Sequence, residues 1–405
     1  GEENSNIKIA SNVFQMSATS TNECIVLSSA KYNIININAN QFYDFQKAIY
    51  FPSGIGDSIN VINNFINSTI NSSAYGIVAN VLLSKAKLYY NTFVTSQFCL
   101  NGYLENYTLL NNIFQSNVEC INNVSTNKLA QSDFNNYNTS GSYIVAWNGG
   151  YYDLNSYKAL SHTLAGGNDA HSMNTPPSIV MMGKPYEPYS NSLVIDNGLV
   201  LPEVTKDIEG RPRDKYTPTI GCYETYGKIH GDYTVGGIDG DFPLVASVFN
   251  MLNEMGTTID GPLNFTVREQ VLFENLTLNQ LNGASATNKV TFTGLSTPVA
   301  DSAHLFGLNL NMTNVKYVTF KNLGFRVVSG GEGHGVFLYE GCKDISFENC
   351  SFYGMGLGQY SESGLYFNSY NGISNIFVKN CQFLNTPYGI YFNANMQKGR
   401  TLVIE

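Results

Sequence analysis

Apolar and polar residues alternate over short stretches along the chain, and this two-residue period predicts β-strands. In the first 150 residues each such stretch leads into Asn, one further residue and an aromatic ring. A second apolar stretch, such as 48–51 or 75–78, lies between successive phrases. Two strands and a turn at this repeat length predict the coils of a parallel β-helix. The repeated Asn residues are Asn12, Asn40, Asn63, Asn91, Asn112 and Asn135.

The same pattern returns after residue 316 in three segments that align with one another. Each aligned segment is followed by a strand that begins with Gly. Asn at one position of consecutive coils can hydrogen-bond to the coils on both sides. We therefore expect two Asn ladders, one in each repeat region, that hold the coils in register. In the second region the ladder residues are Asn322, Asn349 and Asn380.

From about residue 151 the repeat stops and short motifs of another kind follow. They include Asp169-Ala170-His171-Ser172, then Asp207-Ile208-Glu209-Gly210-Arg211 and Gly221-Cys222-Tyr223-Glu224. In this order they resemble the closing segment of secreted right-handed parallel β-helix surface proteins of the Bacteroidota. The resemblance covers about residues 160–226 and departs at Thr219 and Cys222, where Asp and Ala are commoner. It implies that salt bridges hold this segment, formed by Asp207, Arg211, Arg213 and Glu224.

A second resemblance begins with the run 231–237 and continues through Asp241-Phe242-Pro243. These residues are similar to the opening of β-helix domains in the same surface proteins, where a helix follows. The residues themselves also predict a helix over about 242–256, which Asp241 can cap and Gly256 can end. A helix here would cover the open first coil. Its predicted apolar face comprises Leu244, Val245, Val248, Phe249, Leu252 and Met255.

We therefore expect an all-β chain of two right-handed parallel β-helices in tandem. The first would span residues 1–226, with its closing segment at about 151–226. The second would span residues 227–405 and begin with the capping α-helix. Because the first strand lacks a cap and residues 401–405 resemble the start of another coil, we expect the chain to be a segment of a longer protein.

Charge is scarce in this chain, at 13% of residues with a net charge of −9, and no basic run occurs. Nucleic acids and anionic membranes are therefore poor partners, because both select clustered Lys and Arg. No apolar stretch is long enough to span a bilayer. Residues 1–150 contain neither Arg nor His, so a catalytic face there would consist almost entirely of amides and hydroxyls.

The candidate catalytic residues are Glu332 and His334 on a Gly-rich turn, with Arg326 nearby in sequence. A polysaccharide lyase or hydrolase needs such acid–base and charge-neutralising groups, but a His in a solvated loop is the alternative. Asp239 and Asp241 could hold Ca²⁺, with helix capping as the competing interpretation for Asp241. No other metal or cofactor is expected.

Seven cysteines form no metal-binding motif. Cys350 and Cys381 fall at equivalent positions of consecutive repeats. The sequence leaves open whether this pair, or Cys99 and Cys120, forms a disulfide or remains as stacked thiols.

An acidic, Arg-poor repeat surface favours a structural or adhesive function over catalysis. Together with the resemblance, it predicts a non-catalytic segment of a large extracellular cell-surface protein or appendage of the type IX secretion kind. Expected partners are copies of the chain or neighbouring domains, with surface glycans a further candidate. The alternatives are a polysaccharide lyase or hydrolase and a glycan-binding module.

Overall fold

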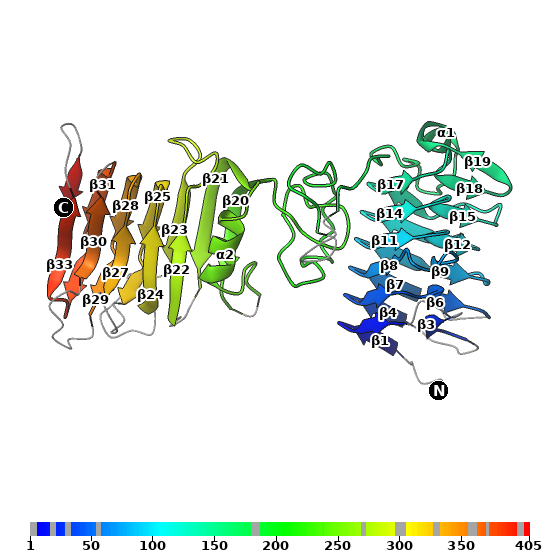
Figure 1. The fold of residues 1–405 in the computed structure, drawn as a ribbon, viewed down its shortest axis with the longest axis horizontal. Helices are drawn as coiled ribbons and strands as arrows, with labels where there is room; N and C mark the ends of the chain where they lie inside the picture. The colour runs from blue at the N-terminus through cyan, green and yellow to red at the C-terminus, as the bar shows by residue number, and fades with distance from the viewer. Residues whose placement is uncertain are drawn as a thin grey trace. The chain divides into compact units, whose positions relative to one another are not determined.

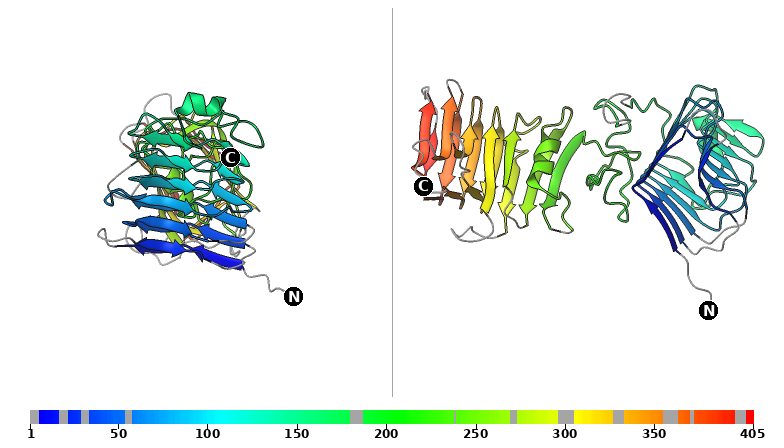
Figure 2. Two further views of the ribbon diagram at one scale, coloured as in Figure 1. Left: turned by 90° about the vertical axis from the view of Figure 1, so that its right-hand side faces the viewer. Right: turned by 60° about the horizontal axis from the view of Figure 1, so that its bottom comes forward.

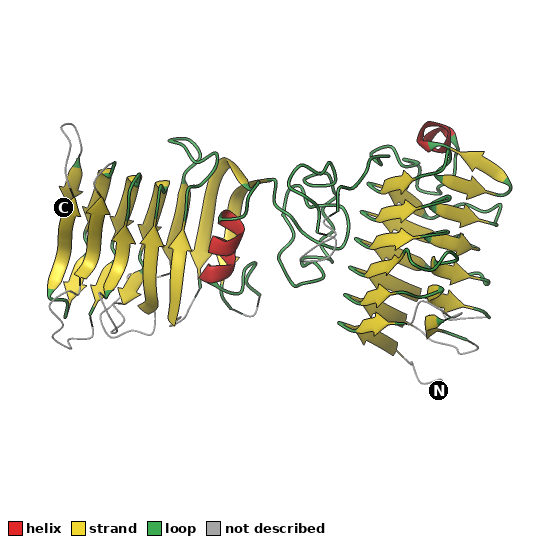
Figure 3. Ribbon diagram, in the orientation of Figure 1, coloured by secondary structure: helices red, strands yellow, loops and turns green. Residues whose placement is uncertain are grey.

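The computed structural model describes residues 6–16, 22–28, 34–53, 58–179, 187–237, 239–268, 273–295, 305–326, 333–354, 363–369, 372–394 and 401–405. Within these ranges nearly all of the regular secondary structure is β-strand, with two short helices (Figure 3). Its strands form a parallel β-solenoid of about 12 turns. The chain divides into two compact units, Gly1–Thr225 and Tyr226–Glu405, one residue before the boundary expected from the sequence.

The first unit contains three sheets, so each coil supplies three strands where the sequence pattern predicts two (Figure 1). Within the described residues all strand pairs are parallel except the last, β18 with β19. The first sheet is β1 (Asn6–Ala10), β4 (Ile34–Asn38), β7 (Ser58–Ile62), β10 (Ala86–Tyr89), β13 (Tyr107–Leu110) and β16 (Gln131–Asp133). The second is β2 (Val13–Gln15), β5 (Gln41–Tyr43), β8 (Phe65–Ser68), β11 (Thr92–Thr95), β14 (Ile113–Ser116) and β17 (Asn136–Thr139). The third is β3 (Glu23–Val26), β6 (Lys47–Phe51), β9 (Tyr75–Ala79), β12 (Leu100–Gly102), β15 (Ile121–Asn123), β18 (Val145–Trp147) and β19 (Gly150–Tyr152).

A sharp corner in every coil explains the additional strand. One residue at this corner adopts the left-handed backbone conformation, with φ between 54° and 59°. It separates a strand of the first sheet from a strand of the second in each coil, and Figure 2 shows the resulting stack in its left panel. Side chains other than Gly rarely adopt this conformation, so the packing around the corner must offset its cost. The corner residues are Ser11, Ala39, Asn63, Tyr90, Asn111 and Phe134.

The residue that follows each corner is an Asn, and these Asn side chains form one continuous ladder. Asn40 shows the pattern: its Nδ2 donates to Oδ1 of Asn64 in the next coil at 3.1 Å. The same Nδ2 donates to the backbone oxygen of Ile9 in the preceding coil at 2.9 Å. Oδ1 of Asn40 in turn accepts from the backbone N and the Nδ2 of Asn12. Each interior amide is therefore fully hydrogen-bonded although it is buried.

The ladder corrects one of the predicted positions. Asn12, Asn40, Asn91, Asn112 and Asn135 belong to it, but the third coil contributes Asn64 and not Asn63. Two adjacent Asn residues made the register ambiguous, and the aromatic residue two positions after Asn63 favoured the wrong choice. Phe65 instead lies on the other face of its strand, beside Tyr223 at a ring-centroid distance of 6.4 Å.

Aromatic rings stack inside the first unit two residues after the ladder. Phe14 and Phe42 are 4.8 Å apart, and Phe93 and Phe114 are 5.3 Å apart. Ile66 interrupts the ring column, since it pairs in register with both Phe42 and Phe93. Each coil is thus joined to the next both by the polar ladder and by the apolar column beside it.

The second unit also consists of parallel sheets. One sheet is β20 (Lys228–Val235), β21 (Thr258–Val267), β23 (Val290–Gly294), β25 (Lys316–Lys321), β28 (Lys343–Glu348), β31 (Ser374–Lys379) and β34 (Leu402–Ile404). A second face is β22 (Phe273–Leu278), β24 (Leu305–Met312), β27 (His334–Leu338), β30 (Ser363–Ser369) and β33 (Tyr388–Ala394). The start of β24 also pairs with a third face, β26 (Gly324–Arg326), β29 (Ser351–Tyr353) and β32 (Gln382–Leu384).

The Asn residues predicted to form a ladder in this unit lie at the corner itself. Asn322, Asn349 and Asn380 have φ of 53°, 53° and 52°, so they match Asn63 and not Asn64 of the first unit. One side-chain hydrogen bond joins Asn349 to Asn322, at 3.3 Å. Asn suits this role because its short polar side chain tolerates the left-handed conformation. The ladder position is occupied instead by Leu323, Cys350 and Cys381.

The predicted helix is present but shorter than expected, as α2 (Val245–Leu252). Asp241 does not cap it, because its carboxylate accepts hydrogen bonds from Thr234, and the N-cap position is Leu244. Val245, Val248, Phe249 and Leu252 enter the core of the unit, but Met255 lies beyond the helix and is 92% exposed.

Replacing one interior ladder residue tests the role assigned to the ladder. Asn91→Ala should lower the free energy of unfolding of the first unit by about 1–3 kcal/mol, because it leaves buried partners unsatisfied in both neighbouring coils. Urea unfolding followed by the fluorescence of Trp147, the single Trp of the chain, measures this change. Asn80→Ala is the control, since Asn80 is exposed and bonds only the hydroxyl of Tyr50 among its side-chain contacts described here. Equal effects of the two substitutions would contradict the ladder's role.

Candidate functional site

The closing segment begins with α1 (Leu154–Ala159) and continues as irregular chain along the corner of the first unit. Its contacts follow the corner residues from coil to coil. His171 stacks on Phe134 at 4.6 Å, and the carbonyl of Leu199 accepts from both Asn111 and Tyr90. Further on, the carbonyl of Lys206 accepts from Asn63. The left-handed corners thus present the side chains that bind the closing segment.

The closing segment also terminates the Asn ladder. The backbone N of Asn135, the last ladder residue, donates to Oγ of Ser172 at 2.9 Å. Ser172 in turn donates to the carboxylate of Asp169 at 2.5 Å. The hydroxyl of Tyr137 donates to the same carboxylate oxygen at 3.0 Å. The Asp-Ala-His-Ser motif therefore supplies the acceptors that a further coil would otherwise provide.

His162 completes this buried cluster. Its Nε2 lies 2.9 Å from Asp169 Oδ2, its Nδ1 lies 2.7 Å from the carbonyl oxygen of Leu160, and both side chains of the pair are fully enclosed. Since both ring nitrogens face acceptors, the cluster needs a proton on each nitrogen or one on the carboxyl. Burial acts to raise the pKa of Asp169, but the hydrogen bonds from His162 and Ser172 outweigh it and the pKa is lowered. This cluster, which sequence reasoning missed, is part of the fold's closure.

Arg213 lies at the centre of a second buried cluster. Its guanidinium pairs with Glu224 at 3.1 Å and donates to Oδ1 of Asn63 at 2.8 Å. It also lies 3.7 Å over the ring of Tyr90 and donates to the carbonyls of Thr219 and Gly221. A side chain 150 residues distant in sequence from Asn63 is thereby attached to the ladder corner.

The other two residues of the predicted salt-bridge set have different partners. Asp207 is buried and accepts from the backbone N of Glu209, Arg211 and Glu224, so it shapes the turn through main-chain contacts. Arg211 pairs with Glu187 at 2.9 Å and with Glu209 at 3.5 Å.

The buried carboxyl groups around Arg213 outnumber this one buried cation. Burial raises the pKa of Glu224 to about 8, with a smaller opposing effect from Arg213, and Asp214 raises it further. The pKa of Asp207 is also raised by burial, against the attraction of Arg213. A proton held on Glu224 reduces the excess of negative charge around Arg213, where Asp207 and Asp214 are also buried.

The predicted catalytic residues do not form a described site. Glu332 lies outside the described residues, and only the backbone of Arg326 is described, in β26. His334 lies on β27 and not on a solvated turn, and it is only 2% exposed. Its Nδ1 is 2.8 Å from the hydroxyl of Ser363, and its ring stacks on Tyr366 at 4.1 Å.

The calcium prediction also has no geometric support in the described part of the chain. Asp239 pairs with Arg268 at 3.2 Å, while Asp241 bonds the backbone N and the hydroxyl of Thr234. Among the described residues no group of three or more His, Cys, Asp or Glu side chains could hold a metal ion.

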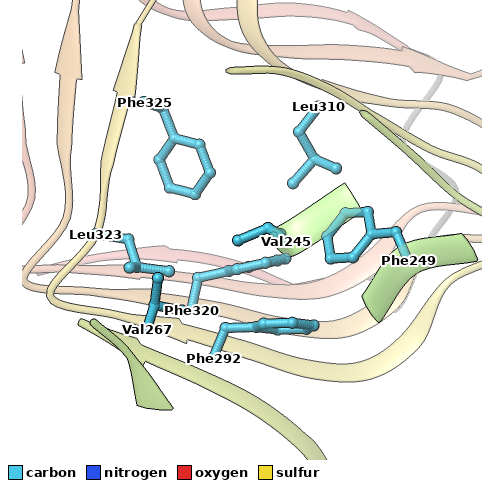
Figure 4. Close-up of a pocket in the computed structure, with 8 residues that line it drawn as sticks. All are labelled: Val245, Phe249, Val267, Phe292, Leu310, Phe320, Leu323 and Phe325. Atoms are coloured by element: carbon cyan, nitrogen blue, oxygen red, sulfur yellow. The ribbon is translucent and has the colours of Figure 1, made fainter. Parts of the chain in front are cut away.

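A pocket of the second unit lies between α2 and the sheets, and Figure 4 shows apolar side chains around it. The helix contributes two of them, and the strands and corners contribute the rest. With no polar group in its lining, the pocket can pack apolar atoms but cannot orient a polar substrate. Its lining residues are Val245, Phe249, Val267, Phe292, Leu310, Phe320, Leu323 and Phe325.

The outer surface of β27, β30 and β33 carries rows of aromatic and amide side chains, which we call the aromatic face. Phe337, Tyr366 and Tyr391 lie in register, and the rings of Tyr366 and Tyr391 are 5.3 Å apart and almost parallel. In the same strands Asn368 and Asn393 flank these rings on one side, and on the other side the row is exposed only at Tyr388, because His334 and Ser363 are buried. Tyr388 and Tyr391 are 42% and 40% exposed. The signal in the sequence was the aromatic residue two positions after each strand-leading Gly.

No protein-family model, curated protein or solved structure matches this chain. None of the helices in the described ranges is long and apolar enough to cross a membrane.

The raised pKa of Glu224 predicts a pH dependence with a definite sign. Because the unfolded carboxyl titrates near its ordinary value of 4.5 and the folded one near 8, the folded state holds an additional proton between these values. The first unit should therefore lose stability as pH rises from about 5 to about 8. Urea midpoints from Trp147 fluorescence should fall over this interval.

Glu224→Gln should flatten this pH dependence, because the amide cannot ionise. Glu203→Gln is the matched control, because Glu203 is half-exposed and its partner, Lys87, is 3.7 Å away and also partly exposed. A slope that persists in Glu224→Gln would show that another group holds the proton.

Proposed function

We propose that this chain is a non-catalytic structural and adhesive segment of a large secreted cell-surface protein or appendage. In this proposal two right-handed β-helices follow one another, and α2 caps the first coil of the second. The observation that carries the adhesive part is the aromatic face of the second unit.

The chemistry of the aromatic face suits neutral polysaccharide. Aromatic rings pack against the C–H groups of sugars, and side-chain amides and hydroxyls exchange hydrogen bonds with sugar hydroxyls. Tyr391 is 40% exposed, and Asn393 follows it in the same strand with its Nδ2 3.2 Å from the hydroxyl of Tyr366. The strand spacing repeats these groups coil after coil, as an extended polymer requires.

The buried polar groups support the structural part of the proposal, because they hold the fold together. The Asn ladder, the His162–Asp169 pair and the Arg213–Glu224 pair all bond parts of the fold to one another. Stacked coils of this kind add up nearest-neighbour interactions and give a stiff element. A stiff spacer that presents a repeated neutral face is suited to attachment at a cell surface.

The aromatic face could also bind a second copy of the same chain. Little charge would have to be desolvated when two such faces meet, because their described side chains are mainly aromatic, amide and hydroxyl. Sedimentation of the wild-type protein and of Tyr391→Ala separates this use from glycan binding.

Retention on insoluble neutral polysaccharides tests the proposal. Cellulose, mannan and xylan should be compared with an acidic polymer such as pectate, and at least one neutral polymer should retain the protein. Tyr391→Ala and Tyr366→Ala should each weaken retention by about 2- to 10-fold, the value of one ring contact. Tyr189→Ala, which removes an exposed ring from the first unit, should have no effect. Equal losses in all three variants, or release of sugar ends that depends on His334, would contradict the proposal.

A further inference from the structure

Cys350 and Cys381 occupy the ladder position of the second unit. The Sγ of Cys350 contacts the carbonyl two residues before it and that of Phe320 in the preceding coil, at 3.5 and 3.4 Å. The Sγ of Cys381 repeats both contacts, with Lys379 and with Phe347. Asn40 contacts the corresponding carbonyls of Asn38 and Ile9. The two thiols therefore replace two amides of a ladder.

The pair lies directly across adjacent parallel strands. The next residues, Ser351 and Gln382, pair in register, and the backbone N of Gln382 donates to the carbonyl of Cys350 at 2.9 Å. The thiols of the two cysteines interact closely enough to shift each other's pKa. Adjacent strands are separated by about 4.8 Å, within the Cα–Cα range that a disulfide spans.

We propose that Cys350 and Cys381 are a redox-modification site that forms a disulfide between consecutive coils of the second unit. This inference goes beyond the proposed adhesive function and does not depend on it. Two thiols cannot reproduce the hydrogen bonds that two ladder amides make between coils. A disulfide would join the two coils covalently at this position instead.

The reaction is a thiol–disulfide exchange with a small disulfide oxidant of the glutathione class. Cys381 attacks one oxidant sulfur as its thiolate, forms a mixed disulfide and releases one thiol. Cys350 then attacks Sγ of Cys381 and releases the second thiol. Two protons leave the protein, and the oxidant takes up two electrons.

Accessibility and ionisation favour this order. Cys350 is 1% exposed, whereas Cys381 is only partly buried at the edge of the core. Burial raises the pKa of Cys350, while the hydrogen bond with Cys350 lowers the pKa of Cys381. The accessible thiol is thus also the better nucleophile.

The first unit provides an internal control. Cys99 and Cys120 also lie across adjacent coils, since Leu100 and Ile121 after them pair in register. Both are 0% exposed, so an oxidant has no approach to either sulfur in the folded protein. The two pairs have equivalent positions across adjacent coils but differ in exposure. Comparing them in one sample therefore tests whether access of the oxidant to the sulfur decides which pair is oxidised.

The experiment treats the full chain with glutathione disulfide under native conditions, then alkylates the remaining thiols in denaturant. Peptide mass mapping should find the peptides of Cys350 and Cys381 joined, with the link lost on reduction. Cys381→Ser should abolish the link and the accompanying rise in melting temperature. Cys342→Ser, which removes another buried thiol of the same unit, and Cys24→Ser should leave both unchanged.

Two outcomes overturn the proposal. One is that Cys350 and Cys381 are both recovered alkylated, or that Cys381 stops as a stable mixed disulfide. The other is that Cys99 and Cys120 become linked at the same rate, since oxidation would then proceed through unfolded chains.

Discussion

The hydrogen bond between the amide of one coil and the amide of the next is the interaction on which the first unit depends. Parallel strands fix the distance between coils, but they allow each coil to slip along its neighbour by two residues without changing which side chains face inward. The ladder removes this freedom, because Asn64 can accept from Asn40 only in one register. The corner, the aromatic column and the position of the closing segment all follow from that register.

The left-handed corner has a second use beyond bending the strand. It turns the side chain before each ladder Asn outward, to where the closing segment lies. Asn63, Tyr90 and Asn111 bind that segment through hydrogen bonds to its backbone or to Arg213. The conformational cost of these three corner residues is therefore coupled to closure. Most of the buried charged groups of the first unit lie where the irregular chain is held without strand pairing.

The two units apply the same coil geometry with different chemistry. In the first, buried amides occupy the ladder, whereas in the second Leu323, Cys350 and Cys381 do so and Asn moves to the corner. Aromatic columns such as Phe265, Phe292, Phe320 and Phe347 then supply the contact between coils. The second unit also carries a row of aromatic rings in register on its outer face, formed by Phe337, Tyr366 and Tyr391.

The sequence by itself determined the parallel coils, the approximate boundary between the two units and most of the first ladder. These features depend on period and spacing, which neighbouring residues set. It did not determine that each coil has three strands, because one left-handed residue leaves no mark on an alternating pattern. It also could not decide between Asn63 and Asn64, since the choice depends on the coils above and below. Tyr137 beside Asp169, Asn63 beside Arg213 and Ser363 beside His334 come from distant parts of the chain, so only the tertiary structure could bring them together and bury them.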